Sequence, residues 1–250
     1  MTQGCRTPTG VFVADNFRTN LIVDRYDPYL LSMRGAKTEA MRSENSEDVL
    51  TWNVFRSLAQ VDPSIWVPLL FGRSFRTAVP ARHLVTLQLW KCLEPPPALR
   101  LFQRDEGESE VDVLIESEAF VWVIEAKYRS DISERTTNNP ERDQVLRNLD
   151  VGSWHAGVRD FYFSLLVLDA AMAARGAALA EKYRASRNEV VEKLPHRPDG
   201  LQNLRGIGLL RWSDCAAVLE ESAMSAGQDN ERVVATRAVE WLRGKGIPSP

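Results

Sequence analysis

Three charged residues interrupt a stretch of the chain that is otherwise rich in strand-forming residues. In "SEVDVLIESEAFVWVIEAKYRSD", residues 109–131, the side chains of Asp112, Glu125 and Lys127 lie inside or at the ends of apolar runs. Burying an ionised side chain costs several kcal/mol unless a partner charge or a metal ion compensates it. These strand ends therefore either remain in contact with water or bind a ligand.

The two apolar runs of this stretch predict a β-hairpin. The runs "EVDVLI" and "AFVWVIEAKY" flank a polar "ESE", and the second run is apolar on both faces, as is typical of a central strand covered by helices. Glu125 and Lys127 are two residues apart, so they point to the same face. A turn centred on residues 118 and 119 would place Asp112 opposite Glu125, whereas a turn one residue earlier would place Glu110 there. The sequence leaves these two registers open.

Either register brings two carboxylates and one ammonium group to one end of the hairpin. Like charges at this spacing repel each other unless a cation lies between them. Mg²⁺ prefers oxygen ligands, uses one or two carboxylates and keeps water molecules that a phosphate can replace. The pattern therefore predicts a Mg²⁺ site, at which we expect Mn²⁺ to substitute.

This arrangement resembles the PD-(D/E)xK nuclease superfamily, whose fold is the restriction-endonuclease-like core. The resemblance is carried by Asp112 and by "IEAK", residues 124–127, at the end of a buried strand. In that family the Asp and the Glu ligate the metal, and the Lys orients and activates the attacking water. The resemblance implies that Asp112 and Glu125 are metal ligands and that Lys127 activates the water or contacts the phosphate.

An acidic residue on the first core helix extends the resemblance. Many family members carry such a residue, and it reaches the metal. Glu47 fits this place, with Glu44 and Asp48 as alternatives, so the resemblance implies that Glu47 is a third metal ligand. Acids in a first helical turn also complement the helix dipole, which is the competing explanation for Glu47 and Asp48.

A glutamine after the E-x-K strand is the last match. Many family members carry it on the following helix, and Gln144 takes that place, so we count Gln144 among the catalytic residues. In the exonuclease branch a Tyr follows four residues later, where this chain has Asn148. The Pro of the first motif is replaced by Val111. The resemblance covers residues 45–168.

The predicted fold class is α/β, with a restriction-endonuclease-like αβββαβ core in which helices flank a central mixed β-sheet. We predict one domain, residues 1–250, with an N-terminal arm (1–43), a core (44–222) and a C-terminal helix (223–250). The expected strands are 64–72, 84–94, 98–102, 110–115, 119–128, 160–168 and 207–212. The expected helices are 45–60, 138–152, 169–194, 213–222 and 230–245.

The net charge and the lack of long apolar segments limit the partners that the chain is expected to bind. The net charge is −3 and the pI about 5.8, so any nucleic-acid surface must be a local basic patch, for which Arg129, Arg135, Arg142 and Arg147 are candidates. The first residues, "MTQGCRTPTG", lack a basic start followed by an apolar run, and no segment approaches roughly 18 uninterrupted apolar residues. We therefore expect a cytoplasmic protein without a membrane partner.

The sequence predicts a metal-dependent nuclease that hydrolyses phosphodiester bonds in DNA, in restriction, phage defence or repair. The choice of DNA follows the habit of the family. A homodimer would let one site per subunit cut each strand, but no motif requires one. The alternative is a catalytically inactive scaffold of the same fold that binds nucleic acid or assembles with other molecules. Divalent-metal binding separates the two hypotheses.

Overall fold

The computed structural model describes residues 3–80, 84–102, 107–133 and 142–249, which divide into two compact units. Unit 1 comprises Met1–Trp66 and Ser213–Pro250, and unit 2 comprises Val67–Trp212. Neither boundary coincides with a predicted one. The prediction of one domain with an arm, a core and a C-terminal helix stays a prediction.

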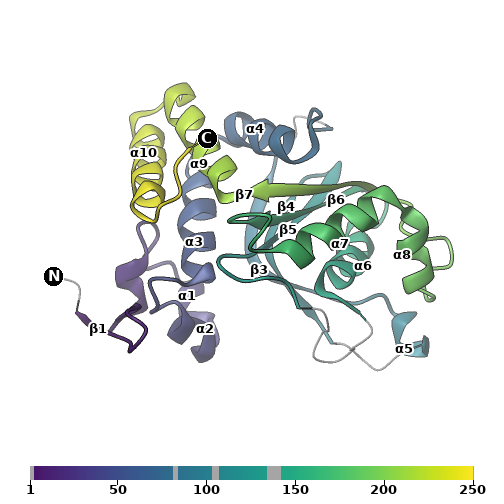
Figure 1. Cartoon of the computed structure of the whole chain (residues 1–250). Coiled ribbons are helices and arrows are strands. Elements are labelled where there is room, and N and C mark those ends of the chain that lie inside the picture. The colour runs from purple at the N-terminus through teal and green to yellow at the C-terminus, as the bar shows by residue number, and fades with distance from the viewer. Residues whose placement is uncertain (1–2, 81–83, 103–106, 134–141, 250) are drawn as a thin grey trace. The chain divides into compact units, whose positions relative to one another are not determined.

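Unit 2 contains a mixed β-sheet. Within the described residues its strands are β3 (Thr86–Leu93), β4 (Ser109–Glu116), β5 (Phe120–Ala126), β6 (Asp160–Val167) and β7 (Leu204–Arg211), in the spatial order β3-β4-β5-β6-β7. The first two pairings are antiparallel and the last two are parallel (Figure 1). The accompanying helices are α5 (Leu99–Phe102), α6 (Gln144–Ala156), α7 (Ala174–Ala185) and α8 (Arg187–Lys193). The α/β class with a central mixed sheet flanked by helices is confirmed.

Strand β5 is central because it is apolar on both faces, and all seven of its residues are buried. On one face Val123 packs in a cluster with Leu149 of α6. On the other face the Phe71 ring, from the helix α4 (Pro63–Phe75), meets the rings of Trp122 and Tyr162 at centroid distances of 5.4 and 4.9 Å. Burial of each such side chain contributes about 1.5–3 kcal/mol. The hydrophobic layers thus fix the strand whose end carries Glu125.

Two of the predicted strands are helices. Residues 64–72 form most of α4 and residues 99–102 form α5. The Asp62 carboxylate accepts a hydrogen bond from Ser64 N (2.8 Å), and Pro63 occupies the first helical position, where its missing N–H costs nothing. Pro68 lies inside α4, although a proline in a helix interior ordinarily destabilises the helix. The N-terminal cap at Asp62 therefore outweighs the helix-destabilising effect of Pro68.

Helix α6 begins at Gln144 and is capped by Asp143, whose side chain accepts a hydrogen bond from Leu146 N (2.9 Å). The predicted cap at residues 138 or 139, with Pro140 following, lies outside the described residues. Gly152 was predicted to end this helix, but it lies inside α6. A Cβ at Gly152 would lie 2.5 Å from two atoms of the Phe161 ring. Gly152 therefore lets helix and sheet approach closely.

We expect Gly152→Ala to lower the free energy of unfolding by about 2 kcal/mol, because overpacking against the buried Phe161 ring exceeds the gain in helix propensity. Gly72→Ala in α4 is the matched control, since the nearest atom to its new Cβ is 3.9 Å away. This control should gain about 0.5–1 kcal/mol. Urea unfolding of both variants checks the pair, and an unchanged or higher stability for Gly152→Ala would contradict the close-approach argument.

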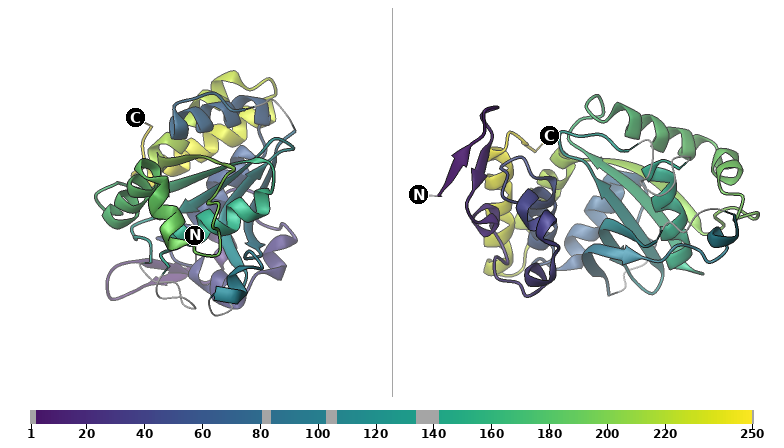
Figure 2. Two further views of the ribbon diagram at one scale, coloured as in Figure 1. Left: turned by 90° about the vertical axis from the view of Figure 1, so that its right-hand side faces the viewer. Right: turned by 90° about the horizontal axis from the view of Figure 1, so that it is seen from below.

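Unit 1 is built around α3. Its elements are β1 (Gly4–Arg6), β2 (Phe12–Ala14), the 3₁₀ helix η1 (Phe17–Asn20), α1 (Tyr29–Ser32), α2 (Gly35–Ala40), α3 (Glu47–Leu58), α9 (Trp212–Ser225) and α10 (Asp229–Gly244). Ser46 caps α3, as its cap-type residues predict, and β1 and β2 pair with each other (Figure 2). Asn53 binds the preceding chain through Ile22 N (2.9 Å) and Asn20 O (2.9 Å). In the part of the chain that the structure describes, no helix has the length and apolarity needed to cross a membrane.

Candidate metal site at the end of strand β5

The hairpin register places Asp112 opposite Glu125. The antiparallel β4–β5 ladder runs from Glu116–Val121 to Val113–Ile124, and its register continued by one residue would bring Asp112 opposite Glu125. The Asp112 carboxylate accepts a hydrogen bond from Ala126 N at 2.8 Å, which ties it to the end of β5. The first of the two registers left open by the sequence is therefore the one adopted.

Glu125 and Lys127 form a buried ion pair. Glu125 is 2% exposed, Lys127 is 8% exposed, and Lys127 Nζ lies 2.6 Å from Glu125 Oε1. The backbone of Lys127 is held by its N–H on Leu166 O (2.7 Å) and by Trp212 Nε1 on its carbonyl (3.0 Å). The pair is thus not a solvated strand end.

Two amide side chains of α6 donate to the same carboxylate. Gln144 Nε2 lies 2.5 Å from Glu125 Oε1, and Asn148 Nδ2 lies 2.6 Å from Glu125 Oε2. The two residues are four apart and so share one face of the helix. Gln144 Oε1 also accepts from Ser133 N at 3.3 Å, which orients the amide. Asn148, at which the sequence departs from the exonuclease pattern, contacts Glu125 beside Gln144 and is part of this site.

The hydrogen bonds leave one acceptor position on Glu125 without a donor from the described residues. A carboxylate has about four lone-pair positions. Lys127 and Gln144 occupy Oε1, and Asn148 occupies one position on Oε2. The remaining position on Oε2 and the Asp112 carboxylate would be the ligands of a Mg²⁺ ion, which takes one or two carboxylates in proteins. These residues fit a Mg²⁺ ion that keeps most of its water.

Glu44, Glu47 and Asp48 all lie in unit 1. Glu44 accepts a hydrogen bond from Phe12 N at 2.6 Å, and Asp48 lies 3.4 Å from Lys37 Nζ. Glu47 is the first residue of α3. Its assignment as a metal ligand stays a prediction.

No group of three or more His, Cys, Asp and Glu residues that could hold a metal ion gathers among the described residues. The described part of unit 2 thus offers Asp112 and Glu125 as a pair rather than a cluster of three acids. A metal ion bound there would depend on water and on substrate oxygens for its remaining ligands.

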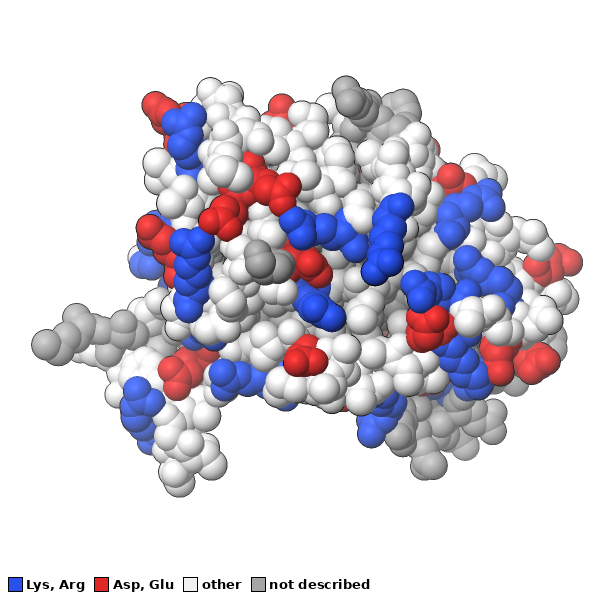
Figure 3. Space-filling view, turned by 45° about the horizontal axis from the view of Figure 1, so that its top comes forward, with Lys and Arg blue, Asp and Glu red and all other residues white. Residues whose placement is uncertain are grey.

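Two members of the predicted basic patch, Arg142 and Arg147, are engaged by acceptors of the protein. Arg142 is 1% exposed and lies 2.9 Å from the Asp150 carboxylate, while Arg147 donates to Glu108 O at 3.0 Å. Arg135 lies outside the described residues. On the face drawn in Figure 3, basic and acidic side chains are interspersed. Among the described members of the predicted set, Arg129 is exposed.

The segment after Lys127 is anchored to α7 by Asp131. Its carboxylate accepts from the backbone N–H groups of Ile132 (2.7 Å), Arg175 (2.9 Å) and Gly176 (2.9 Å). Burial raises the pKa of Asp131, but the backbone hydrogen bonds from Gly176, Arg175 and Ile132 together outweigh it, so the net direction is downward. The ionised carboxylate therefore stabilises the fold.

We expect the stability contributed by the Asp131 charge to be fully present above the pKa of the unfolded state, about 3.9, and to be lost as the pH falls through the lower pKa of the folded state. Asp131→Asn should be less stable than the wild type at pH 7, and the difference should shrink below about pH 4. Urea unfolding from pH 2 to 7 measures this. A difference that does not change with pH would contradict a role for the charge.

The comparisons with known proteins supply no further guide to this site. A scan against family models and searches of curated proteins and of solved structures found no match. The assignment of a function therefore rests on the geometry of these residues.

Proposed function

We propose that the protein is a Mg²⁺-dependent nuclease of the PD-(D/E)xK type, which hydrolyses phosphodiester bonds in DNA. The observation that carries this proposal is the β4–β5 register, which brings the Asp112 carboxylate onto Ala126 N (2.8 Å) at the end of a buried central strand, where Lys127 Nζ lies 2.6 Å from Glu125. An acid-x-Lys tripeptide by itself occurs by chance about once in a chain of this composition. The convergence of Asp112, Glu125, Lys127 and Gln144 is far more specific.

Each residue has a role in this proposal. Asp112 and Glu125 would hold the metal ion, which supplies a bound water of lowered pKa and offsets charge on the phosphate. Lys127, held beside Glu125, would hold the attacking water or donate to a phosphate oxygen. Gln144 and Asn148 fix the orientation of the Glu125 carboxylate from α6.

One observation favours the inactive scaffold as a second candidate. Lys127, Gln144 and Asn148 already satisfy most of the acceptor capacity of Glu125, so this carboxylate is stable without a cation. In that case the same contacts would only join β5 to α6. Metal binding and cleavage decide between the candidates.

The test is cleavage of linear, circular and single-stranded DNA by the purified chain with Mg²⁺ or Mn²⁺, and with EDTA. Asp112→Asn should abolish metal-dependent cutting. Glu110→Gln is the matched control, because Glu110 is the exposed acid on β4 that the other register would have used, and this variant should cut normally. No cutting, together with no Mn²⁺ binding by calorimetry, would replace the nuclease with the scaffold.

We expect Asn148→Ala to weaken Mn²⁺ binding and to slow cleavage by about 10–100-fold, the usual effect of removing a group that orients a metal ligand. Asn148 is 3% exposed, so circular dichroism must show that the variant is folded. Gln144→Ala should act in the same direction, and the double variant should lose less than the product of the single effects, because both amides hold one carboxylate. A normal Mn²⁺ affinity in Asn148→Ala would refute the orienting role.

A further inference from the structure

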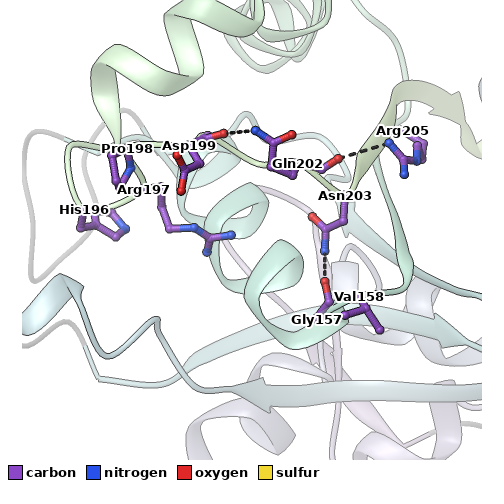
Figure 4. A pocket seen from close by; sticks show the side chains of 10 residues that line it. Gly157, Val158, His196, Arg197, Pro198, Asp199, Gln202, Asn203 and Arg205 are labelled. Atoms are coloured by element: carbon purple, nitrogen blue, oxygen red, sulfur yellow. Dashed lines mark hydrogen bonds between the residues drawn. The ribbon is translucent and has the colours of Figure 1, made fainter.

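A polar pocket of about 580 Å³ lies at the opposite end of the sheet from Glu125. The turn between α6 and β6 forms one wall, the loop after α8 a second, and the start of β7 a third (Figure 4). Phe120 and Asp160, the first residues of β5 and β6, pair at this end of the sheet. The pocket is therefore separate from the candidate metal site.

Arg197 is the partly buried cation of this pocket. Its Nη1 donates to Asp150 Oδ1 (3.2 Å) and its Nη2 to Ser153 Oγ (3.1 Å), both on α6. A guanidinium has five N–H donors, and acceptors of the described residues use two of them here. The remaining donors of Arg197 can serve a ligand.

The charge of Arg197 is only partly offset by its carboxylate partner. Asp150 is fully buried and also accepts from Arg142 (2.9 Å) and from His196 Nε2 (2.7 Å). Burial lowers the pKa of Arg197, and the nearby charge of Asp150 raises it less. Because Asp150 is shared with other donors, the partly buried guanidinium of Arg197 favours an additional anion on its pocket side.

Arg205 adds a second cation to the lining. Its Nε donates to Asp160 Oδ1 (2.6 Å) and its Nη1 to Gln202 O (3.2 Å), so three of its donors have no acceptor among the described residues. Desolvation, and secondly the positive charge of Arg205, lower the pKa of the neighbouring Arg187. Arg205 thus adds a positive charge to this side of the pocket, whose lining also includes Asp199.

The walls of the pocket are held by fixed polar contacts. Asn203 Nδ2 donates to the carbonyls of Ser153 (2.9 Å) and Gly157 (2.8 Å), and Asn203 Oδ1 accepts from Ser153 Oγ (2.7 Å). Gly200, at φ +69°, closes the loop through its N–H on Arg197 O at 2.8 Å. Such contacts preorganise the site.

We propose that this pocket binds a small molecule that carries a phosphate group, with Arg197 and Arg205 as its anion-binding residues. The guanidinium fork matches phosphate oxygens and donates charge-assisted hydrogen bonds to them. The volume falls within the range of about 300–1,000 Å³ that is usual for small-molecule sites, so it holds an organic body as well as the phosphate. A carboxylate accepts the same charge-assisted hydrogen bonds, but it has fewer oxygens than a phosphate group to accept them.

The test is calorimetry on the full chain carrying Asp112→Asn, in EDTA, so that the candidate metal site does not contribute. The probes are inorganic phosphate, adenosine monophosphate and acetate. We expect saturable binding of the two phosphates, with acetate at least about tenfold weaker. Arg197→Gln and Arg205→Gln should each weaken phosphate binding about tenfold, as expected for a lost hydrogen bond to a charged group.

Arg184→Gln is the control, because Arg184 is exposed on α7, pairs with Glu181 and does not line the pocket. It should leave phosphate binding unchanged. Arg205→Gln keeps the test decisive if Arg197→Gln disturbs the Asp150 cluster, since Arg205 lies at the surface. Absence of phosphate binding, equal binding of acetate, or binding that Arg205→Gln leaves unchanged would overturn the proposal.

Discussion

In single-turnover assays with Mg²⁺, Lys127→Met should cleave DNA about a hundredfold to ten thousandfold more slowly than the wild-type chain. The substitution keeps an apolar stem in the buried position and removes the ammonium group that lies 2.6 Å from Glu125. A positioned charge in a water-poor site contributes far more to a transition state than the same charge in bulk water. The cleavage rate at saturating Mg²⁺ measures this loss.

Lys182→Met is the control for this prediction, because Lys182 lies on α7 at the surface and pairs with Glu189. Its cleavage rate should match that of the wild type. Removing one partner of a buried pair also destabilises a fold, so thermal unfolding must show that Lys127→Met remains folded at the assay temperature. A folded Lys127→Met variant that cuts at the wild-type rate would remove Lys127 from the mechanism.

The largest effect on stability is expected at Asp150. Asp150→Ala should lower the free energy of unfolding by about 3–5 kcal/mol, because its removal leaves buried positive groups without the carboxylate they share. Asp150 is fully buried and accepts hydrogen bonds from Arg142, His196 and Arg197. Urea unfolding at pH 7 measures the change.

Asp160→Ala provides the comparison for this result. Asp160 pairs with Arg205 at the surface, where the side chain of Arg205 is 52% exposed, and an exposed ion pair contributes only about 0–1 kcal/mol. If both substitutions cost the same, burial of the Asp150 cluster would not be the source of its effect.

The sequence was sufficient to predict the hairpin and the meeting of its charges. Apolar residues on both faces of a strand are typical of the centre of a covered sheet, and the strand predicted at 119–128 is found as β5, which is shorter at both ends. The choice of register was not available from the sequence, because either of two turns satisfied the same alternation. In the structure Ser117 settles it: its Oγ accepts from Ala119 N and Phe120 N, at 3.2 Å each, and fixes the turn.

Other features depended on contacts that no local pattern contains. By residue type Gly152 predicts the end of a helix, yet the structure requires a glycine there because the Phe161 ring on the neighbouring strand leaves no room for a Cβ. Asn148 reads as an ordinary polar residue until Glu125 is known to lie beside it. Its spacing of four from Gln144 was the one available signal, and it needed the position of β5 to be interpreted.

The way Glu125 is held has a consequence for the order of folding. Its described partners, Lys127, Gln144 and Asn148, all follow it within the next 23 residues of the chain. Loop-closure entropy grows with sequence separation, so contacts this local cost little to form before distant strands are added. We therefore expect the polar cluster to assemble together with the β4–β5 hairpin and α6. Strand β7 should join the sheet later, and the hydrogen bond from Trp212 to the Lys127 carbonyl should form at that stage.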